Sequence, residues 1–225
     1  MPTILITGAN RGIGLELARS FAKDGWRVHA CCRDPEGANE LRAVDGTVVV
    51  HRLDVTDGAM VAALARELDG EAIDILFNNA GVYGPRTGFG ETDYEAWEPV
   101  FSINVFAPLR LAECFVGHVA RSERKLILNM SSVMGSIAEG GGGSYIYRSS
   151  KAALNMMTKT LSVDLAGQGI AVVAFHPGWV QTDMGGSHAT VDVRDSVKGL
   201  RQIVAGLSTE DNGGFFAYDG RKLPW

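Results

Sequence analysis

The stretch Ile4-Leu5-Ile6-Thr7-Gly8-Ala9-Asn10-Arg11-Gly12-Ile13-Gly14 decides the fold of this 225-residue chain. Its first three residues are apolar, with β-branched ends, and predict a buried parallel strand. After the glycines, apolar residues recur at helical spacing until Asp24-Gly25 ends the pattern. A strand, a glycine turn and a helix in this order predict a phosphate site, because backbone N–H groups at a helix N-terminus can approach an anion closely.

The glycine turn has two interpretations. Its spacing, G-x-x-x-G-x-G, departs from the G-x-G-x-x-G pattern that is common in dinucleotide sites. Glycines that only tighten the passage from strand to helix would explain the same residues. If the turn binds a dinucleotide, we expect the contacts at Gly8, Asn10, Arg11, Gly12, Ile13 and Gly14.

The rest of the chain continues the alternation of strand and helix. Apolar segments predict strands near residues 3–7, 26–32, 47–51, 73–77, 125–130, 170–175 and 214–218, with helical patterns in most of the intervals. This alternation is typical of a Rossmann-type, doubly wound parallel sheet of about seven strands with helices on both faces. Because 46% of the residues are hydrophobic and no linker interrupts the pattern, we expect one α/β domain over residues 1–225.

The segment Tyr147-Arg148-Ser149-Ser150-Lys151 places a phenol and an ammonium one helical turn apart on the same face. A cation beside a phenol favours the phenolate and lowers the phenol pKa from about 10. Tyr147 is therefore a candidate proton donor and acceptor for a ketone or aldehyde whose carbon receives hydride. A solvated helix face is the ordinary explanation of an isolated pair, so the assignment depends on the other segments. Tyr145 is a rival phenol, but on the same helix it would face away from Lys151.

Several further residues share the order and rough spacing of one family with the glycine turn and the Tyr–Lys pair. They are Thr7, Gly8, Gly12, Gly14, Asn78, Asn79, Ala80, Gly81, Asn104, Ser132, Tyr147, Lys151, Pro177, Gly178 and Thr182. Along nearly its whole length the chain thus resembles the classical short-chain dehydrogenases/reductases. The last part of the chain most resembles the branch of C-factor-like signalling proteins and sniffer-like carbonyl reductases. The segments that carry this resemblance are Trp179–Gly186, Tyr218–Gly220 and Leu223–Trp225.

The resemblance implies four catalytic residues. Tyr147 would donate the proton, Ser132 would hydrogen-bond the substrate oxygen, and Lys151 would lower the pKa of Tyr147 and bind the nicotinamide ribose. Asn104 would support proton resupply through a water held by its backbone carbonyl. The residues themselves add that Pro108, four positions after Asn104, has no N–H to give that carbonyl, although a plain proline kink is the alternative. Ser131 is the alternative to Ser132, and the family pattern favours the second.

The cofactor preference is argued from Cys31-Cys32-Arg33-Asp34-Pro35, which ends the second predicted strand. An acidic residue there bonds the ribose 2′-hydroxyl of NAD, whereas a basic one accepts the 2′-phosphate of NADP. In the family alignment Cys32 takes the acidic position and Arg33 follows it, so we expect NADP(H) rather than NAD(H). Asp34, before a proline, is expected to begin a turn. The resemblance adds cofactor contacts at Asp54, Val55, Asn78, Ala80, Gly81, Tyr147, Lys151, Pro177, Gly178, Val180 and Thr182.

Composition and charge exclude other classes. The formal net charge is −5 and the basic residues are dispersed, so we expect no nucleic-acid or membrane partner. No apolar run approaches the roughly 18 residues of a membrane span, and the first residues enter a strand without a secretory pattern, which predicts a cytoplasmic protein. The three cysteines and five histidines show neither a disulfide framework nor zinc-ligand spacing, so no metal is expected. A serine hydrolase would need G-x-S-x-G, which does not occur.

The sequence therefore predicts an NADPH-dependent oxidoreductase that reduces an aldehyde or ketone to an alcohol. The substrate is a small carbonyl or alcohol compound, and Trp179, Met184 and Tyr83 are candidates for an apolar wall around it. The alternative is an NADP-binding, C-factor-like signalling protein with little turnover, since a fold does not determine a function. The resemblance also implies a homodimer or homotetramer.

Overall fold

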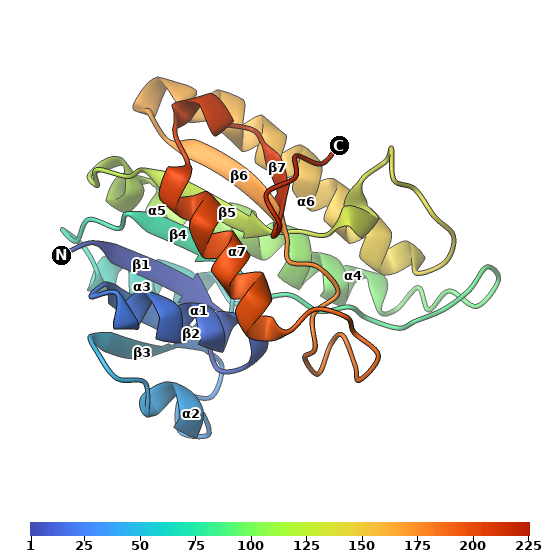
Figure 1. Cartoon of the computed structure of the whole chain (residues 1–225), viewed down its shortest axis with the longest axis horizontal. Coiled ribbons are helices and arrows are strands. Elements are labelled where there is room, and N and C mark those ends of the chain that lie inside the picture. Colours follow the sequence, from blue (N-terminus) through green and yellow to red (C-terminus); the bar gives the residue numbers. More distant parts are fainter.

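The computed structural model describes residues 1–225 as one domain, a seven-stranded sheet with helices on both faces (Figure 1). The strand order is β3-β2-β1-β4-β5-β6-β7, and every neighbouring pair is parallel. The strands are β1 (Thr3–Thr7), β2 (Arg27–Cys32), β3 (Val48–Arg52), β4 (Ile75–Asn78), β5 (Leu126–Met130), β6 (Ala171–His176) and β7 (Phe215–Ala217). The predicted Rossmann-type fold is confirmed, and each predicted strand exists with ends shifted by at most two residues.

Seven α-helices connect the strands. They are α1 (Gly12–Lys23), α2 (Asn39–Arg42), α3 (Gly58–Glu67), α4 (Trp97–Phe101), α5 (Ala107–Ala120), α6 (Tyr145–Asp164) and α7 (Val193–Gly206). Helices α1 and α7 cover one face of the sheet over a core of 25 buried residues, and α3 and α5 cover the other face over a core of 18. Both faces of the sheet are thus buried, which explains why the strands are continuous apolar runs rather than alternating ones.

The carboxyl ends of the strands share one edge of the sheet, and the loops that follow β4, β5 and β6 extend beyond it on the right of Figure 1. The order of the strands reverses between β1 and β4, where sheets of this kind form their ligand crevice. Hydrogen bonds join the two loops at this point. Thr7 Oγ1 accepts the N–H groups of Asn79 (3.1 Å) and Ala80 (3.0 Å), and Asn79 Nδ2 donates to the Thr7 carbonyl (2.9 Å).

One helical stretch differs from the sequence-based expectation. Residues Trp97–Ala120 run as α4, a π-helical turn at Ser102–Phe106, and α5, and together these 24 residues are long and apolar enough to cross a membrane by length and composition. The expectation that no segment approaches a membrane span was therefore wrong. Within the fold the stretch packs against the sheet, and its Leu111 and Phe115 side chains are buried in the core shared with α3. The stretch is a core helix of this domain.

Candidate active site

Three segments that are distant in the sequence meet at the carboxyl edge of the sheet. A methyl group added at Gly81, after β4, would lie 3.3 Å from Asn104 Oδ1 and 3.6 Å from Lys151 Nζ. Asn104 lies in the π-helical turn and Lys151 on α6. The structure therefore brings the loop after β4 together with two of the four predicted catalytic residues.

The glycine turn is tight and bare. Gly8 and Gly12 have φ values of +65° and +54°, which side chains other than glycine rarely adopt. A Cβ at Gly14 would meet the Gly8 carbonyl oxygen and lie 2.6 Å from Asn79 Nδ2. Arg11, the N-cap residue of α1, makes no side-chain cap hydrogen bond, so the N–H groups of the first turn have no side-chain acceptor. This arrangement fits a dinucleotide phosphate at the N-terminus of α1.

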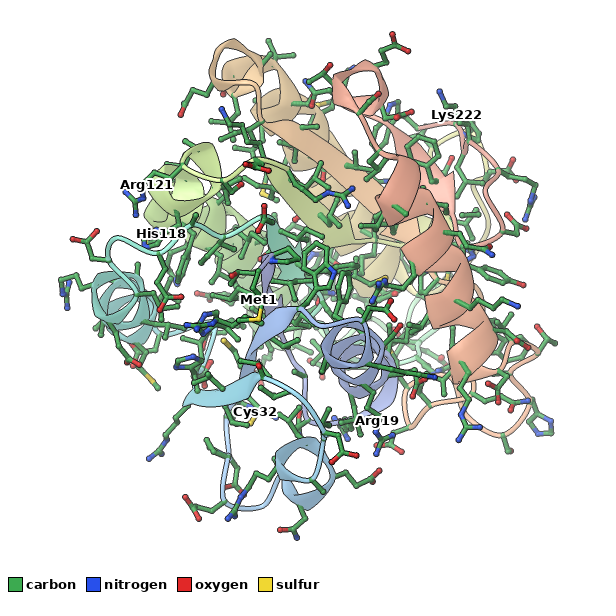
Figure 2. The ribbon with its side chains drawn as sticks, turned by 60° about the vertical axis from the view of Figure 1, so that its left-hand side comes forward. Met1, Arg19, Cys32, His118, Arg121 and Lys222 are labelled. Atoms are coloured by element: carbon green, nitrogen blue, oxygen red, sulfur yellow. The ribbon has the colours of Figure 1, made fainter.

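The end of β2 carries no acidic side chain. Cys32 is buried there and Arg33, directly after it, is exposed. Figure 2 labels Cys32 near α2, toward the β3 edge of the sheet, and Lys222 near β7, toward the opposite edge. Asp34 Oδ1 accepts the Gly37 N–H at 3.2 Å, so this carboxylate closes a turn, as predicted. Arg33 is therefore the exposed cation that directly follows the strand, and Arg52 on β3, paired with Cys32, is a second exposed cation there.

Two other residues of this region are engaged in contacts of their own. Arg11 Nη1 lies 2.8 Å from Asp183 Oδ2, and this exposed ion pair links the glycine turn to the loop after β6. Asp54 accepts from the hydroxyl (2.7 Å) and the N–H (2.9 Å) of Thr56, and these bonds lower the pKa of the carboxyl. The Asp54 carboxylate, just after β3, thus stays ionised and able to accept hydrogen bonds.

Asn78, the last residue of β4, has a buried side chain. It was expected to line the middle of the cofactor together with Ala80 and Gly81, but its side chain is buried because Nδ2 donates to Asn129 Oδ1 on β5 at 2.8 Å. The amide that borders the glycine turn belongs to Asn79 instead, whose Nδ2 also lies 3.2 Å from the Gly8 carbonyl. A cofactor contact at Asn78 stays a prediction, and with the side chain buried it would fall to the backbone.

The loop after β6 lies against the glycine turn. A Cβ at Gly12 would approach Thr182 Cγ2 to 3.2 Å, so these two predicted cofactor segments are neighbours. Gly178, after Pro177, has a φ of +87° and leaves room for the Tyr218 ring, whose Cε1 would lie 2.9 Å from an added Cβ. Val180 is buried and pairs with Val191 through a β-bridge, which fixes the start of this loop.

The predicted helix distortion at Asn104 is confirmed. The Ala107 N–H donates to the Ser102 carbonyl, five residues back, in the π-helical turn. Within this turn the Asn104 side chain clamps the backbone of Val82, donating to its carbonyl at 2.8 Å and accepting its N–H at 2.9 Å. A further bond of 3.0 Å runs from Asn104 Nδ2 to Ser150 Oγ on α6. Asn104 thereby holds the loop after β4 against α6.

Lys151 and Tyr147 are both buried on α6, 4% and 8% exposed. Lys151 Nζ donates to the Met130 carbonyl at 2.9 Å, and burial lowers its pKa to about 8. Burial likewise raises the pKa of Tyr147 to about 12, although a hydrogen bond from Ser132 acts in the opposite direction. The prediction that Lys151 lowers the Tyr147 pKa was wrong for this structure, because desolvation of the phenolate dominates and Nζ lies 5.7 Å from the ring centroid.

The two serines after β5 have different neighbours. The Ser131 hydroxyl donates to Asn155 Oδ1 on α6 and is buried away from Tyr147. Ser132 Oγ accepts the Met134 N–H at 3.1 Å, and Ser132, not Ser131, is the serine that acts on the pKa of Tyr147. The rival phenol Tyr145 is 40% exposed at the first position of α6. The geometry therefore favours Ser132 and Tyr147 within each pair of alternatives.

Comparison with known proteins agrees with this arrangement. Residues 2–191 match the family model described as short chain dehydrogenase. The chain belongs to the short-chain dehydrogenase family. It is 43% identical to the C-signal of Myxococcus xanthus over 154 residues, which cover 68% of this chain and 93% of that protein. Both the predicted family and its oxidoreductase class are thereby confirmed.

Two solved structures of carbonyl reductases match this short-chain dehydrogenase over its whole length. The NADPH-bound carbonyl reductase from chicken fatty liver has a TM-score of 0.93 and 35% identity, with 100% of this chain and 99% of that chain covered. The carbonyl reductase Sniffer of D. melanogaster has a TM-score of 0.94 and 35% identity, with both chains covered completely. These matches agree with the predicted branch of the short-chain dehydrogenases and with the predicted cofactor.

Some residues that position this site were not among the predicted catalytic or cofactor-contacting residues, although Thr7 and Asn79 belong to the motifs of the family resemblance. Thr7 and Asn79 tie the glycine turn to the loop after β4, and Ser150 anchors Asn104. Each of these residues is polar and stands directly before a predicted site residue in the sequence, and this position could have identified it as a positioning residue. What it bonds to depends on strand order and helix packing, which local sequence does not specify.

Proposed function

We propose that this short-chain dehydrogenase is an NADPH-dependent reductase of aldehydes or ketones. The observation that carries the proposal is the meeting of Gly81, Asn104 and Lys151 at the carboxyl edge of the sheet, with Tyr147, a buried phenol, one turn before Lys151 on α6. At neutral pH such a phenol holds its proton, which is the form that a general acid needs in carbonyl reduction. The similarity to carbonyl reductases along the full chain supports the same direction.

The chain's own residues suit the remaining parts of the reaction. When bound, NADPH would supply the hydride to the carbonyl carbon. Ser132 would hold the substrate oxygen by a hydrogen bond while Tyr147 donates its proton to that oxygen. Lys151, with a pKa lowered to about 8, is mostly protonated near neutral pH yet gives up a proton readily, so it is suited to reload Tyr147. Asn104 keeps the loop after β4 in place beside Lys151.

The preference for NADPH over NADH rests on the end of β2. Exposed Arg33 would pair with a 2′-phosphate, whereas buried Cys32 offers no carboxylate to a 2′-hydroxyl. The phosphates would lie on the glycine turn and the nicotinamide near Thr182. We propose that the whole chain, residues 1–225, serves as this dinucleotide-binding domain, and that Trp179 and Met184 wall the substrate.

We also propose that the enzyme is a homodimer or homotetramer in the cytoplasm, with no nucleic-acid or membrane partner. Four large apolar side chains support self-association. Phe106 and Leu109, in and after the π-helical turn, are 49% and 36% exposed, and Met156 and Val163 on α6 are 69% and 68% exposed. Large apolar side chains exposed on these helices are the kind of surface that a protein interface would cover.

The test is oxidation of NADPH and of NADH with a panel of aldehydes, ketones and quinones, with Tyr147→Phe run alongside. Turnover with NADPH that Tyr147→Phe abolishes supports the reductase. The similarity to the C-signal keeps one alternative, an NADP-binding signalling protein, but the assembled Ser132, Tyr147 and Lys151 favour catalysis. If no compound is reduced while NADPH still raises the melting temperature, the signalling alternative replaces the reductase.

A further inference from the structure

The ring of Tyr147 is covered by a second tyrosine. Tyr83, in the loop after β4, stacks on Tyr147 with ring centroids 4.2 Å apart and an interplanar angle of 14°. The two residues are 64 positions apart in the chain, so this contact is a product of the fold. Tyr83 covers one face of the Tyr147 ring, so the edge that carries the hydroxyl is not covered by this contact. Tyr83 therefore limits the planes that the Tyr147 ring can adopt.

Tyr83 is itself held from two sides. Its hydroxyl lies 3.0 Å from Ser144 Oγ, and Ser144 has a φ of +50°, rare for a residue with a side chain. Ser144 occupies the N-cap position of α6 but makes no side-chain cap bond, because its hydroxyl is turned toward Tyr83. Gly84, which follows Tyr83 in the chain, has a φ of +74°, and a Cβ there would lie 2.7 Å from Val100 Cγ2. The backbone therefore has a positive φ both at Ser144, which contacts the Tyr83 hydroxyl, and at Gly84, which follows Tyr83.

Arg86 adds a third layer. Its guanidinium carbon lies 4.2 Å from the centroid of the Tyr83 ring, a cation–π contact with the same ring that stacks on Tyr147. Its Nη2 donates to the Met184 carbonyl at 2.7 Å. Met184 belongs to the loop after β6 that we propose as a substrate wall. The stack Arg86–Tyr83–Tyr147 therefore connects the catalytic tyrosine to the loop at the substrate entrance.

We propose that Tyr83 is a positioning residue for the general acid Tyr147, and that Arg86 keeps Tyr83 seated by joining it to the substrate loop at Met184. The proposal rests on the proposed reductase function. Tyr83 itself transfers no proton. Its ring fixes the orientation of the Tyr147 ring, so that the hydroxyl stays beside Ser132 when a carbonyl oxygen arrives.

Kinetics of three variants test the role in turnover. Tyr83→Leu removes the stack and is expected to lower kcat by about tenfold, because the general acid is no longer held in position. Tyr83→Phe keeps the stack and loses only the bond to Ser144, so it should recover most of this loss. Tyr94→Leu is the matched control, since Tyr94 lies in the same loop region, is 76% exposed and stacks on Trp97 instead. A Tyr83→Leu enzyme with an unchanged kcat and a raised KM would overturn the proposal, because that is the behaviour of a wall residue.

A second readout does not depend on turnover. In protein with ring-labelled tyrosine, the NMR signals of Tyr147, assigned by their loss in Tyr147→Phe, should carry a ring-current shift from Tyr83. This shift is expected to disappear in Tyr83→Leu and to persist in Tyr83→Phe and Tyr94→Leu. Its persistence in Tyr83→Leu would show that the rings are not stacked and would overturn the proposal.

Arg86→Met covers the case in which Tyr83→Leu does not fold, because Arg86 is exposed. This variant should lower kcat by about two- to fivefold, as expected for loss of one cation–π layer, and should move the Tyr147 signals. Unchanged kcat and unchanged signals would overturn the role of Arg86. If the wild type reduces no carbonyl compound while the ring-current shift is present, the proposed reductase function is overturned, whereas the stacking of Tyr83 on Tyr147 is supported.

Discussion

Replacement of Lys151 by methionine is expected to stabilise the protein while removing its activity. Lys151 is 4% exposed, makes one hydrogen bond, to the Met130 carbonyl, and has no carboxylate partner. Burial lowers its pKa from 10.5 to about 8, which corresponds to about 3 kcal/mol of free energy that opposes folding when the ammonium is charged. Lys151→Met removes this charge and keeps the side-chain length. It also leaves the Met130 carbonyl without its donor, which costs about 1 kcal/mol. The net gain should be about 2 kcal/mol near pH 7.

The gain should depend on pH with a definite sign. Because the pKa of Lys151 is lower in the folded state, the unfolded chain binds one more proton between about pH 8 and pH 10.5, and the stability of the wild type rises across this window. The variant lacks the group, so its advantage of about 2 kcal/mol shrinks by about 3 kcal/mol over the same window, and the wild type becomes the more stable protein before the upper end is reached. Tyr147, with a pKa raised to about 12, makes the folded state less stable above about pH 10, but it does so in both proteins and cancels in the difference.

The assay is urea denaturation followed by circular dichroism at several pH values from about 7 to about 10, with equal m-values for the two proteins as the condition for comparison. Lys159→Met is the matched control, because Lys159 lies on the same helix and is exposed, so its replacement should change stability little at any pH. A Lys151→Met protein that is less stable than the wild type near neutral pH would refute the reasoning. A stability difference that does not change with pH would refute it as well.

Two further predictions concern the cofactor. Gly14→Ala places a methyl group against the Gly8 carbonyl and 2.6 Å from Asn79 Nδ2, so it should cost about 1–3 kcal/mol of stability and weaken NADPH and NADH alike. Denaturation and fluorescence titration measure these effects, and Gly117→Ala on α5, where a Cβ meets only Arg121 Nη1 at 3.8 Å, is the control that should be neutral or stabilising. Arg33→Ala should raise the Kd of NADPH by about tenfold to a hundredfold and leave that of NADH unchanged, since one charge-assisted pair with the 2′-phosphate is lost. Arg42→Ala, an exposed arginine on nearby α2, is its control, and an equal loss of NADH binding in Arg33→Ala would contradict the assignment.

Local patterns predicted the parts of the molecule that depend on local physics. Apolar runs located all seven strands, and the glycines located the turn, because each of these signals lies within one segment of the chain. Pro108 indicated the distortion at Asn104 for the same reason, since a missing N–H acts on a carbonyl one turn away. The order of the strands then brings Gly81, Asn104 and Lys151 together.

The parts that were not predicted depend on what the fold places around a residue. The side chain of Asn78 turns inward because Asn129, on the neighbouring strand, pairs with it. The pKa of Tyr147 moves opposite to the expectation because desolvation by burial is the largest influence on it, and the extent of burial is a property of the folded chain. Pro108 predicted a distortion at Asn104 but not its form, a π-helical turn through which Trp97–Ala120 continue as one stretch.

The most direct measurement is the rate of hydride transfer in a single turnover, with NADPH already bound, in the wild type and in Tyr147→Phe. Because Tyr147 is the proposed proton donor, the rate in Tyr147→Phe should fall by about 10²–10⁴-fold while the Kd of NADPH changes little. A Tyr147→Phe enzyme that binds NADPH normally and transfers hydride at the wild-type rate would contradict Tyr147 as the general acid.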